Sequence, residues 1–189
     1  MSQQELLKRI IQLLDARKIA YMVTGSVTSS LQGEPRSTHD IDFVIDVPAG
    51  AGDLLLGAFP ESEFYVSDQA IRDAVSGRTM FNAVDLKSAD KVDFWLLTDE
   101  PFDRSRFDRK QTAEVEGMRF LVSAPEDTIL MKLRWAVLSG GSEKQFTDAL
   151  RVYYEVQHGV LDLDYLNEWA VRLAVQSLWH QLCDEATPL

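Results

Sequence analysis

The spacing of apolar residues predicts that helices and strands are mixed over the first two thirds of this 189-residue chain. Residues 3–17 carry Leu6, Ile10, Leu13 and Leu14 at helical spacing, which predicts an amphipathic helix. Short apolar runs bounded by polar turns predict strands at 19–24, 40–47, 81–86, 91–97 and 118–123. A strand followed by a short helix is predicted at 64–77, and further short helices at 26–33 and 49–60.

The last third of the chain shows helical patterns alone. Ser123 and Glu126 form an S-x-x-E capping box, so a helix is expected from Pro125 to the glycine pair 140–141. Two or three more helices are expected within 146–157 and 163–186. Mixed elements followed by helices alone favour an α/β (α+β) fold. We expect two parts: an α/β core, 1–123, and a C-terminal helical part packed on it, 124–189.

Composition narrows the class of protein. An apolar content of 46% is enough for one buried core with a helical appendage. One cysteine, Cys183, and three histidines exclude a disulfide framework and the usual zinc spacings, and fit a reducing cytoplasm. The net charge of -11 argues against a large nucleic-acid surface. No apolar run is long enough to cross a bilayer, and the N-terminus lacks a signal-peptide pattern, so we expect a cytoplasmic protein.

Two aspartates in the predicted strand 40–47 carry the first functional signal. Because side chains alternate along a strand, Asp40 and Asp42 share one face while Ile41 and Phe43 occupy the other. Ionising two neighbouring carboxylates is costly, and a divalent cation such as Mg²⁺ or Mn²⁺ removes that cost. Asp93, with the same apolar flanks in the strand 91–97, completes a three-carboxylate cluster if the two strands are neighbours. Such a cluster can hold metal for in-line phosphoryl chemistry.

A Gly-Ser pair directly after the first strand adds an anion site. Gly25 permits a tight turn, and a helix that begins at Ser26 directs unpaired backbone N–H groups outward. This arrangement suits a triphosphate, with the serine hydroxyl as an added donor.

The combination of G-S, a D-x-D strand and a third Asp on a later strand resembles the nucleotidyltransferase superfamily of the DNA polymerase β type. The stretches GSVTSSLQGEPRSTHDIDFVI and FNAVDLKSADKVDF are similar to small bacterial nucleotidyltransferases related to the AbiEii abortive-infection toxins. The stretch APEDTILMKLRWAVLSGGSEKQFTDAL also resembles a segment that follows the core in those proteins. The resemblance covers about residues 19–150 and implies a mixed sheet flanked by helices.

The resemblance also implies an activity: metal-dependent transfer of a nucleoside monophosphate from an NTP to a hydroxyl, with release of pyrophosphate. It assigns metal binding to Asp40, Asp42 and Asp93, the role of base to Asp93, and triphosphate binding to Gly25 and Ser26. The acceptor is open among a protein, an RNA end and a small molecule. A role as a toxin with a cognate antitoxin follows only from the resemblance. The alternatives are a catalytically silent nucleotide- or partner-binding module and an antibiotic-modifying transferase.

Three further residues are candidates for nucleotide binding. Arg36 and Thr38 precede the first aspartate, where they can contact phosphate or acceptor, although a surface arginine is the plainer interpretation. Lys132 lies in the predicted helix after Pro125, and the resemblance suggests that it reaches the triphosphate; a solvated lysine is the alternative.

Two other features have competing interpretations. Asp85, in the strand 81–86, is the reserve candidate for the third carboxylate. The basic run DRSRFDRK, 103–110, is interpreted first as a solvated loop and second as a docking site for a phosphorylated or RNA acceptor.

Overall fold

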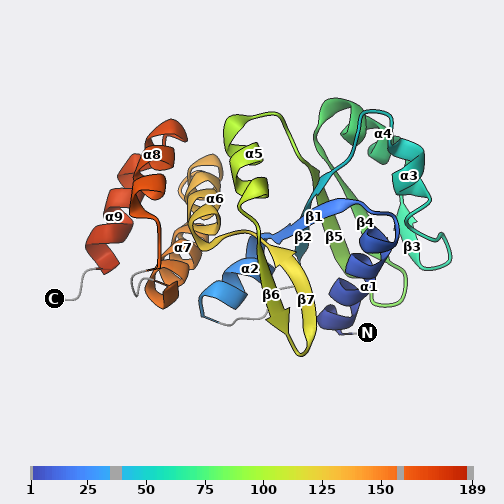
Figure 1. Ribbon diagram of the computed structural model, residues 1–189, viewed down its shortest axis with the longest axis horizontal. Coiled ribbons are helices and arrows are strands. Elements are labelled where there is room, and N and C mark those ends of the chain that lie inside the picture. Colours follow the sequence, from blue (N-terminus) through green and yellow to red (C-terminus); the bar gives the residue numbers. More distant parts are fainter. Residues whose placement is uncertain (1, 35–39, 157–159, 187–189) are drawn as a thin grey trace. The chain divides into compact units, whose positions relative to one another are not determined.

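The computed structural model describes residues 2–34, 40–156 and 160–186 (Figure 1). Along the chain, its helices and strands are α1 (Gln3–Ala16), β1 (Ala20–Thr24), α2 (Gly25–Gln32), β2 (Ile41–Asp46), α3 (Gly52–Leu56), β3 (Phe64–Val66), α4 (Asp68–Gly77), β4 (Met80–Asp85), β5 (Lys91–Leu96), α5 (Pro101–Asp108), β6 (Gln111–Val115), β7 (Met118–Val122), α6 (Pro125–Leu138), α7 (Glu143–Val156), α8 (Leu163–Arg172) and α9 (Gln176–Ala186).

The chain forms two compact units, and the strands of the described ranges all lie in the first. The first unit comprises Met1–Val27 and Thr38–Val122, and the second comprises Thr28–Ser37 and Ser123–Leu189. In the described residues, seven strands form one sheet in the order β3-β4-β5-β2-β1-β7-β6. β2 runs parallel to β5 and β1 parallel to β7, whereas the other neighbours are antiparallel. This mixed sheet with flanking helices confirms the predicted fold class.

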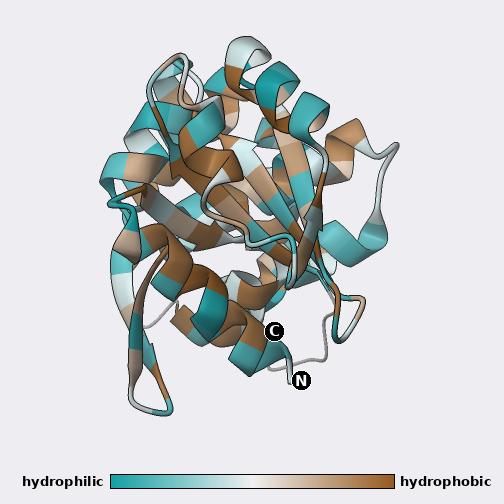
Figure 2. Cartoon of the chain, turned by 90° about the vertical axis from the view of Figure 1, so that its right-hand side faces the viewer, coloured by the Kyte–Doolittle hydropathy of each residue, from teal (hydrophilic) through white to brown (hydrophobic). Residues whose placement is uncertain are grey.

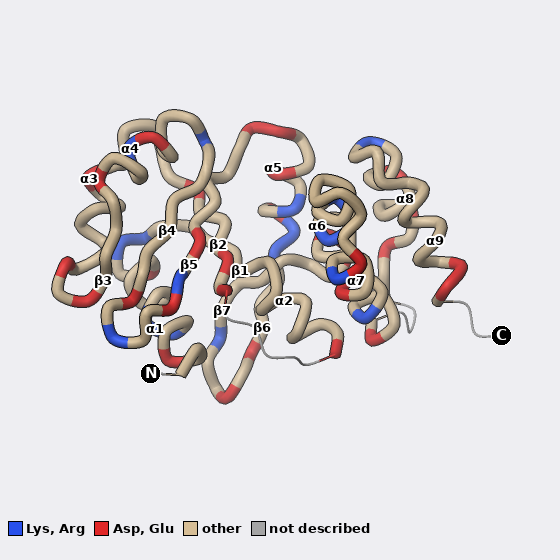
Figure 3. Tube along the Cα trace, turned by 180° about the vertical axis from the view of Figure 1, so that it is seen from behind, with Lys and Arg blue, Asp and Glu red and all other residues tan. Residues whose placement is uncertain are grey.

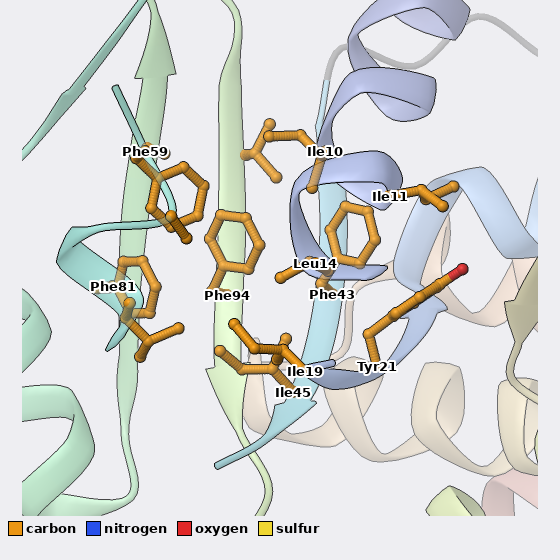
Figure 4. Close-up of a cluster of buried hydrophobic side chains, with 14 of the residues drawn as sticks. Ile10, Ile11, Leu14, Ile19, Tyr21, Phe43, Ile45, Phe59, Phe81 and Phe94 are labelled. Atoms are coloured by element: carbon orange, nitrogen blue, oxygen red, sulfur yellow. The ribbon is translucent and has the colours of Figure 1, made fainter. Parts of the chain in front are cut away.

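One face of the sheet is apolar and is buried under α1, α3 and α4. Phe43, Phe94 and Phe81 lie opposite one another on β2, β5 and β4 (Figure 4). Their rings stack, with centroids 5.5 Å apart for Phe43–Phe94 and 5.0 Å apart for Phe81–Phe94. Side chains of α1 such as Ile10 and Leu14 complete this cluster. Because a slip of one residue reverses which side chains face the core, the aromatic stack fixes the register of these three strands.

The opposite face of the sheet is only partly apolar. Met22, Val44 and Leu97 form a small buried cluster on it with Phe107 of α5. Trp95 of β5 packs against this cluster, and the remaining residues of β2 and β5 on this face are charged. Figure 2 shows hydrophobic residues along the strands and both hydrophobic and hydrophilic residues on the helices. None of the helices in the described ranges is long and apolar enough to span a bilayer.

The second unit is helical, and buried polar contacts join its helices. Lys132 of α6 donates a hydrogen bond to Asp148 of α7 at 2.8 Å, and the exposed fractions of the two side chains are 5% and 4%. The hydroxyl of Tyr165 in α8 donates to Asp127 of α6 at 2.7 Å. Lys132 is therefore buried and paired with a carboxylate, and the interpretation as a solvated lysine is wrong.

Several elements differ from their sequence predictions. The run 103–110 belongs mostly to a helix, α5, because Pro101 starts it and Phe102 and Phe107 are buried. Its arginines pair with acids: Arg104 contacts Asp46 and Asp99, and the buried Arg106 contacts Asp103. The interpretation as a solvated loop is wrong.

Two other local features differ from what the sequence indicated. β6, which the sequence did not predict, is a polar edge strand that pairs only with β7 among the described strands. The predicted capping box at the start of α6 is absent from the described contacts, since Ala124 is the N-cap and makes no side-chain cap hydrogen bond. Glu126 instead accepts a hydrogen bond from the backbone N–H of Asp162.

Asp85 lies at the end of β4 on the helix-covered face, the same side as Phe81. Its buried carboxylate accepts hydrogen bonds from Arg9 of α1, from the backbone N–H groups of Lys87 and Ser88, and from the Ser88 hydroxyl. Burial by itself raises the pKa of Asp85, but these bonds from Ser88 and Arg9 outweigh it and lower the pKa. Asp85 thus anchors the β4–β5 turn, on the opposite face of the sheet from Asp93.

We predict that Asp85→Asn lowers the free energy of unfolding at neutral pH by about 3 kcal/mol, since Arg9 loses a buried carboxylate partner. The folded-state pKa is depressed, so the stabilisation is full above the ordinary pKa of 3.8 and declines as the pH falls through the folded value. Urea unfolding at several pH values measures this. The exposed pair of Asp53 with Arg72 offers the control: Asp53→Asn should change stability by less than about 0.5 kcal/mol. A stable Asp85→Asn without transfer activity would contradict the structural role.

Candidate active site

Asp42 and Asp93 lie side by side on the face of the sheet opposite the aromatic stack. They occupy paired positions of the parallel strands β2 and β5. On the outer flanks, Thr24 of β1 pairs with Asp42 and Asn82 of β4 pairs with Asp93. The predicted neighbourhood of these two strands is therefore observed, and it brings two of the predicted carboxylates together.

Asp40 directly precedes β2 and is exposed, whereas Asp42 is half-buried and Asp93 is buried. Since Ile41 pairs with Val92, Asp40 and Lys91 occupy the next positions toward the start of the two parallel strands. Figure 3 shows acidic and basic positions close together along β5, beside the acidic positions of β2.

Gly25 borders the site next to Asp42, on the side of β1. β1 ends at Thr24, and Gly25 takes a left-handed backbone conformation with φ of 68° before the chain enters α2. A Cβ placed on Gly25 would lie 2.1 Å from Oδ2 of Asp42. Only glycine satisfies both the conformation and the contact, so the turn brings the N-terminus of α2 directly against the Asp42 carboxylate.

Lys91 contributes a cation to the site that the sequence analysis did not identify. Its Nζ lies 2.9 Å from Oδ2 of Asp93. The hydrogen bond to Asp93 and the negative charges of Asp93, Asp40 and Asp42 raise the pKa of Lys91, against the opposing effect of burial. The signal was present in the alternation itself, because Lys91 stands two positions before Asp93 and must share its face.

The other carboxylate oxygen of Asp93 is the unusual atom of the site. Oδ1 is buried and accepts no hydrogen bond from the described residues. An unsatisfied buried carboxylate oxygen is costly, and hard oxygen ligands of this kind are those that Mg²⁺ and Mn²⁺ prefer. The donor set therefore fits a divalent cation, although no three acidic, His or Cys side chains among the described residues are already gathered as a metal site.

The remaining predicted nucleotide-binding residues have different outcomes. Ser26, at the start of α2, is half-buried next to Gly25. Arg36 and Thr38 lie outside the described residues. The ammonium of Lys132 is buried against Asp148 in the second unit.

Comparison with solved structures identifies the fold. The chain matches an antigenic nucleotidyltransferase-like protein from Paracoccidioides brasiliensis with a TM-score of 0.55 and 21% identity, over 94% of this chain and 93% of that one. It matches ANT(2″)-Ia in complex with adenylyl-2″-tobramycin with a TM-score of 0.59 and 14% identity, over 95% and 99% of the two chains. No protein-family model and no curated protein matches the sequence.

A third match is the lincosamide antibiotic adenylyltransferase LnuA bound to lincomycin. Its TM-score is 0.54 and its identity 14%, over 80% of this chain and 96% of that chain. At these identities the likeness shows the fold. The substrates of those proteins are not carried over to this chain.

We predict that Gly25→Ala weakens binding of magnesium-NTP at least ~10-fold, since the added Cβ must displace the Asp42 carboxylate. Gly117 provides a matched control because its φ is 77° and no described atom lies within 4 Å of a Cβ built there. Both substitutions should cost about 1 kcal/mol of strain in the left-handed region. Only Gly25→Ala should alter binding in calorimetric titrations. Equal NTP affinity for the two variants would contradict the placement of Gly25 in the site.

Proposed function

We propose that this chain, which has the nucleotidyltransferase fold, transfers a nucleoside monophosphate from an NTP to a hydroxyl acceptor and releases pyrophosphate. One observation carries the proposal. Asp42 and Asp93 stand in register on adjacent strands, and the glycine turn that starts α2 lies directly against Asp42. A carboxylate pair and a helix N-terminus at one place combine the groups that bind a metal and a triphosphate.

Asp40, Asp42 and Asp93 would hold Mg²⁺ or Mn²⁺ in this proposal. When bound, the cation neutralises charge on the triphosphate and polarises the phosphoryl group that is attacked. The half-buried Asp42 and buried Asp93 form the fixed part of the ligand set. Asp40, which is exposed, supplies the most accessible carboxylate.

The triphosphate is assigned to the first turn of α2. Backbone N–H groups at a helix N-terminus point outward, and together with the helix dipole they attract anions. Gly25 allows a phosphate to approach the backbone closely, and the Ser26 hydroxyl can donate a further hydrogen bond. Arg36 and Thr38 stay predictions for the same triphosphate or for the acceptor.

Asp93 is assigned the role of general base. The acceptor hydroxyl gives its proton to Asp93 as its oxygen attacks the α-phosphorus. The bond between the α-phosphorus and the bridging oxygen then breaks, and pyrophosphate leaves with that oxygen. The position of Asp93 supports this assignment, because its buried carboxylate stands in register with Asp42 on the neighbouring strand.

For the acceptor, we propose a small hydroxyl-bearing molecule of the kind that antibiotic adenylyltransferases modify. Two of the matched structures are described as LnuA with lincomycin and ANT(2″)-Ia with an adenylylated tobramycin. The toxin role and a cognate antitoxin stay predictions from the sequence resemblance alone. A silent binding module is the second candidate, and it differs in releasing no pyrophosphate.

We predict that the wild-type protein releases pyrophosphate with Mg²⁺, at least one NTP and an acceptor panel that includes lincomycin and tobramycin. Asp93→Asn should lower single-turnover transfer by about 10²- to 10⁴-fold, since the acceptor proton loses its base. Its affinity for magnesium-NTP should stay within a few-fold of wild type. Labelled NTPs measure both quantities.

Asp46→Asn is the control for this variant. Asp46 ends β2, on the same strand as Asp42, but it contacts Arg104 at 3.3 Å instead of the carboxylate pair. Its transfer rate should stay within about twofold of wild type. Full transfer by Asp93→Asn would reject Asp93 as base, and NTP binding without pyrophosphate release by the wild type on every acceptor would favour the silent module.

A further inference from the structure

Lys91 places a positive charge in direct contact with the carboxylate pair. Its ammonium donates to Oδ2 of Asp93, and the negative charges of Asp40 and Asp42 also stabilise its protonated form. Three acidic side chains on one face repel one another, and a single ammonium among them offsets part of that repulsion. Lys91 therefore stands where the proposed site calls for positive charge.

We propose that Lys91 is a displaceable counter-ion that couples metal binding to nucleotide binding. Before ligands bind, its ammonium bonds Oδ2 of Asp93, and a metal ion at the same carboxylate would meet that positive charge. When a metal and an NTP enter together, the ammonium moves from Asp93 to the triphosphate. This inference rests on the proposed function, since it assumes that the carboxylates receive metal and nucleotide.

Exposure separates this ion pair from a structural one. The Lys91 side chain is 45% exposed and that of Asp93 is 13% exposed. The Lys132–Asp148 pair has nearly the same N–O distance, 2.8 Å, but both side chains are about 95% buried. A lysine at the solvent boundary can exchange its partner for water or phosphate, whereas a buried one cannot leave without stranding a charge. The flexible four-carbon stem of Lys91 permits this movement.

The two oxygens of Asp93 provide a second argument. Lys91 satisfies Oδ2, whereas Oδ1 is buried with no hydrogen-bond partner among the described residues. A purely structural ion pair is expected to satisfy both oxygens of a buried carboxylate. One satisfied and one unsatisfied oxygen instead fit a group whose complete ligand set is not formed by the protein alone.

The coupling follows from charge. Free metal ions must compete with the Lys91 ammonium for Asp93, so their affinity is reduced. A triphosphate brings its own negative charge, which gives the displaced ammonium a new partner and lowers the cost of displacement. Lys91 should therefore weaken binding of metal alone and strengthen binding of the metal–nucleotide complex. A residue with a merely structural role would not move the two affinities in opposite directions.

The test compares wild type with Lys91→Met and Lys91→Gln, which remove the charge, and with Lys91→Arg, which retains it. Binding of Mn²⁺ alone is measured by electron paramagnetic resonance. Binding of magnesium with each α,β-methylene NTP is measured by calorimetry. Both neutral variants should bind Mn²⁺ alone about five- to tenfold more tightly and the magnesium–nucleotide complex about five- to tenfold more weakly, in the range of typical coupling between sites. Lys91→Arg should stay near wild type in both.

Lys110→Met is the matched control, because Lys110 is half-buried and its Nζ donates to the backbone carbonyl of Phe107 outside the site. It should leave both affinities unchanged. Neutral variants whose two affinities fall together, or do not change, overturn the proposal for Lys91. If wild type binds no magnesium–nucleotide complex at all, the proposed function fails; tighter Mn²⁺ binding by the neutral variants then still supports the counter-ion role, and unchanged binding rejects it.

Discussion

The packing of Phe43 against Phe94 is the constraint on which the rest of this site depends. The two rings face the same core from paired positions of β2 and β5, and Phe81 extends the stack onto β4. Because each strand has a period of two residues, burying these rings turns Asp42 and Asp93 toward the other face, next to each other. The apolar core thus stabilises an arrangement of like charges that the carboxylates would not adopt by themselves.

The chain around β1 and β2 also brings the start of α2 to the carboxylates. β1 is antiparallel to β2, so the end of β1 lies beside the start of β2, and Thr24 pairs with Asp42. A turn directly after Thr24 must pass over Asp42, and Gly25 makes that approach possible. Position 25 therefore affects both the turn and the carboxylate, because any side chain there would overlap the Asp42 carboxylate.

Local alternation explains why much of this could be predicted from the sequence. The D-x-D strand and the V-D-F strand fix which face each acid occupies, whichever strands surround them. The pairing of β2 with β5 was a conditional prediction, since long-range register depends on the whole core. Contacts between residues that are distant in the sequence were not predicted: Lys132 pairs with Asp148, and Glu126 accepts from the backbone of Asp162. The burial of α5 through Phe102 and Phe107 was not predicted either. The partner of Lys91 was within reach, because it follows from the same alternation.

The central claim is that Asp42 and Asp93 bind one metal ion together. A crystal structure of the wild-type protein with Mn²⁺ and a non-hydrolysable NTP, with anomalous diffraction data, tests this most directly. The account predicts an anomalous peak within coordination distance of oxygen atoms from both side chains, with Lys91 withdrawn from Asp93. An ordered nucleotide with its manganese bound elsewhere, and with the Lys91–Asp93 contact intact, would contradict it.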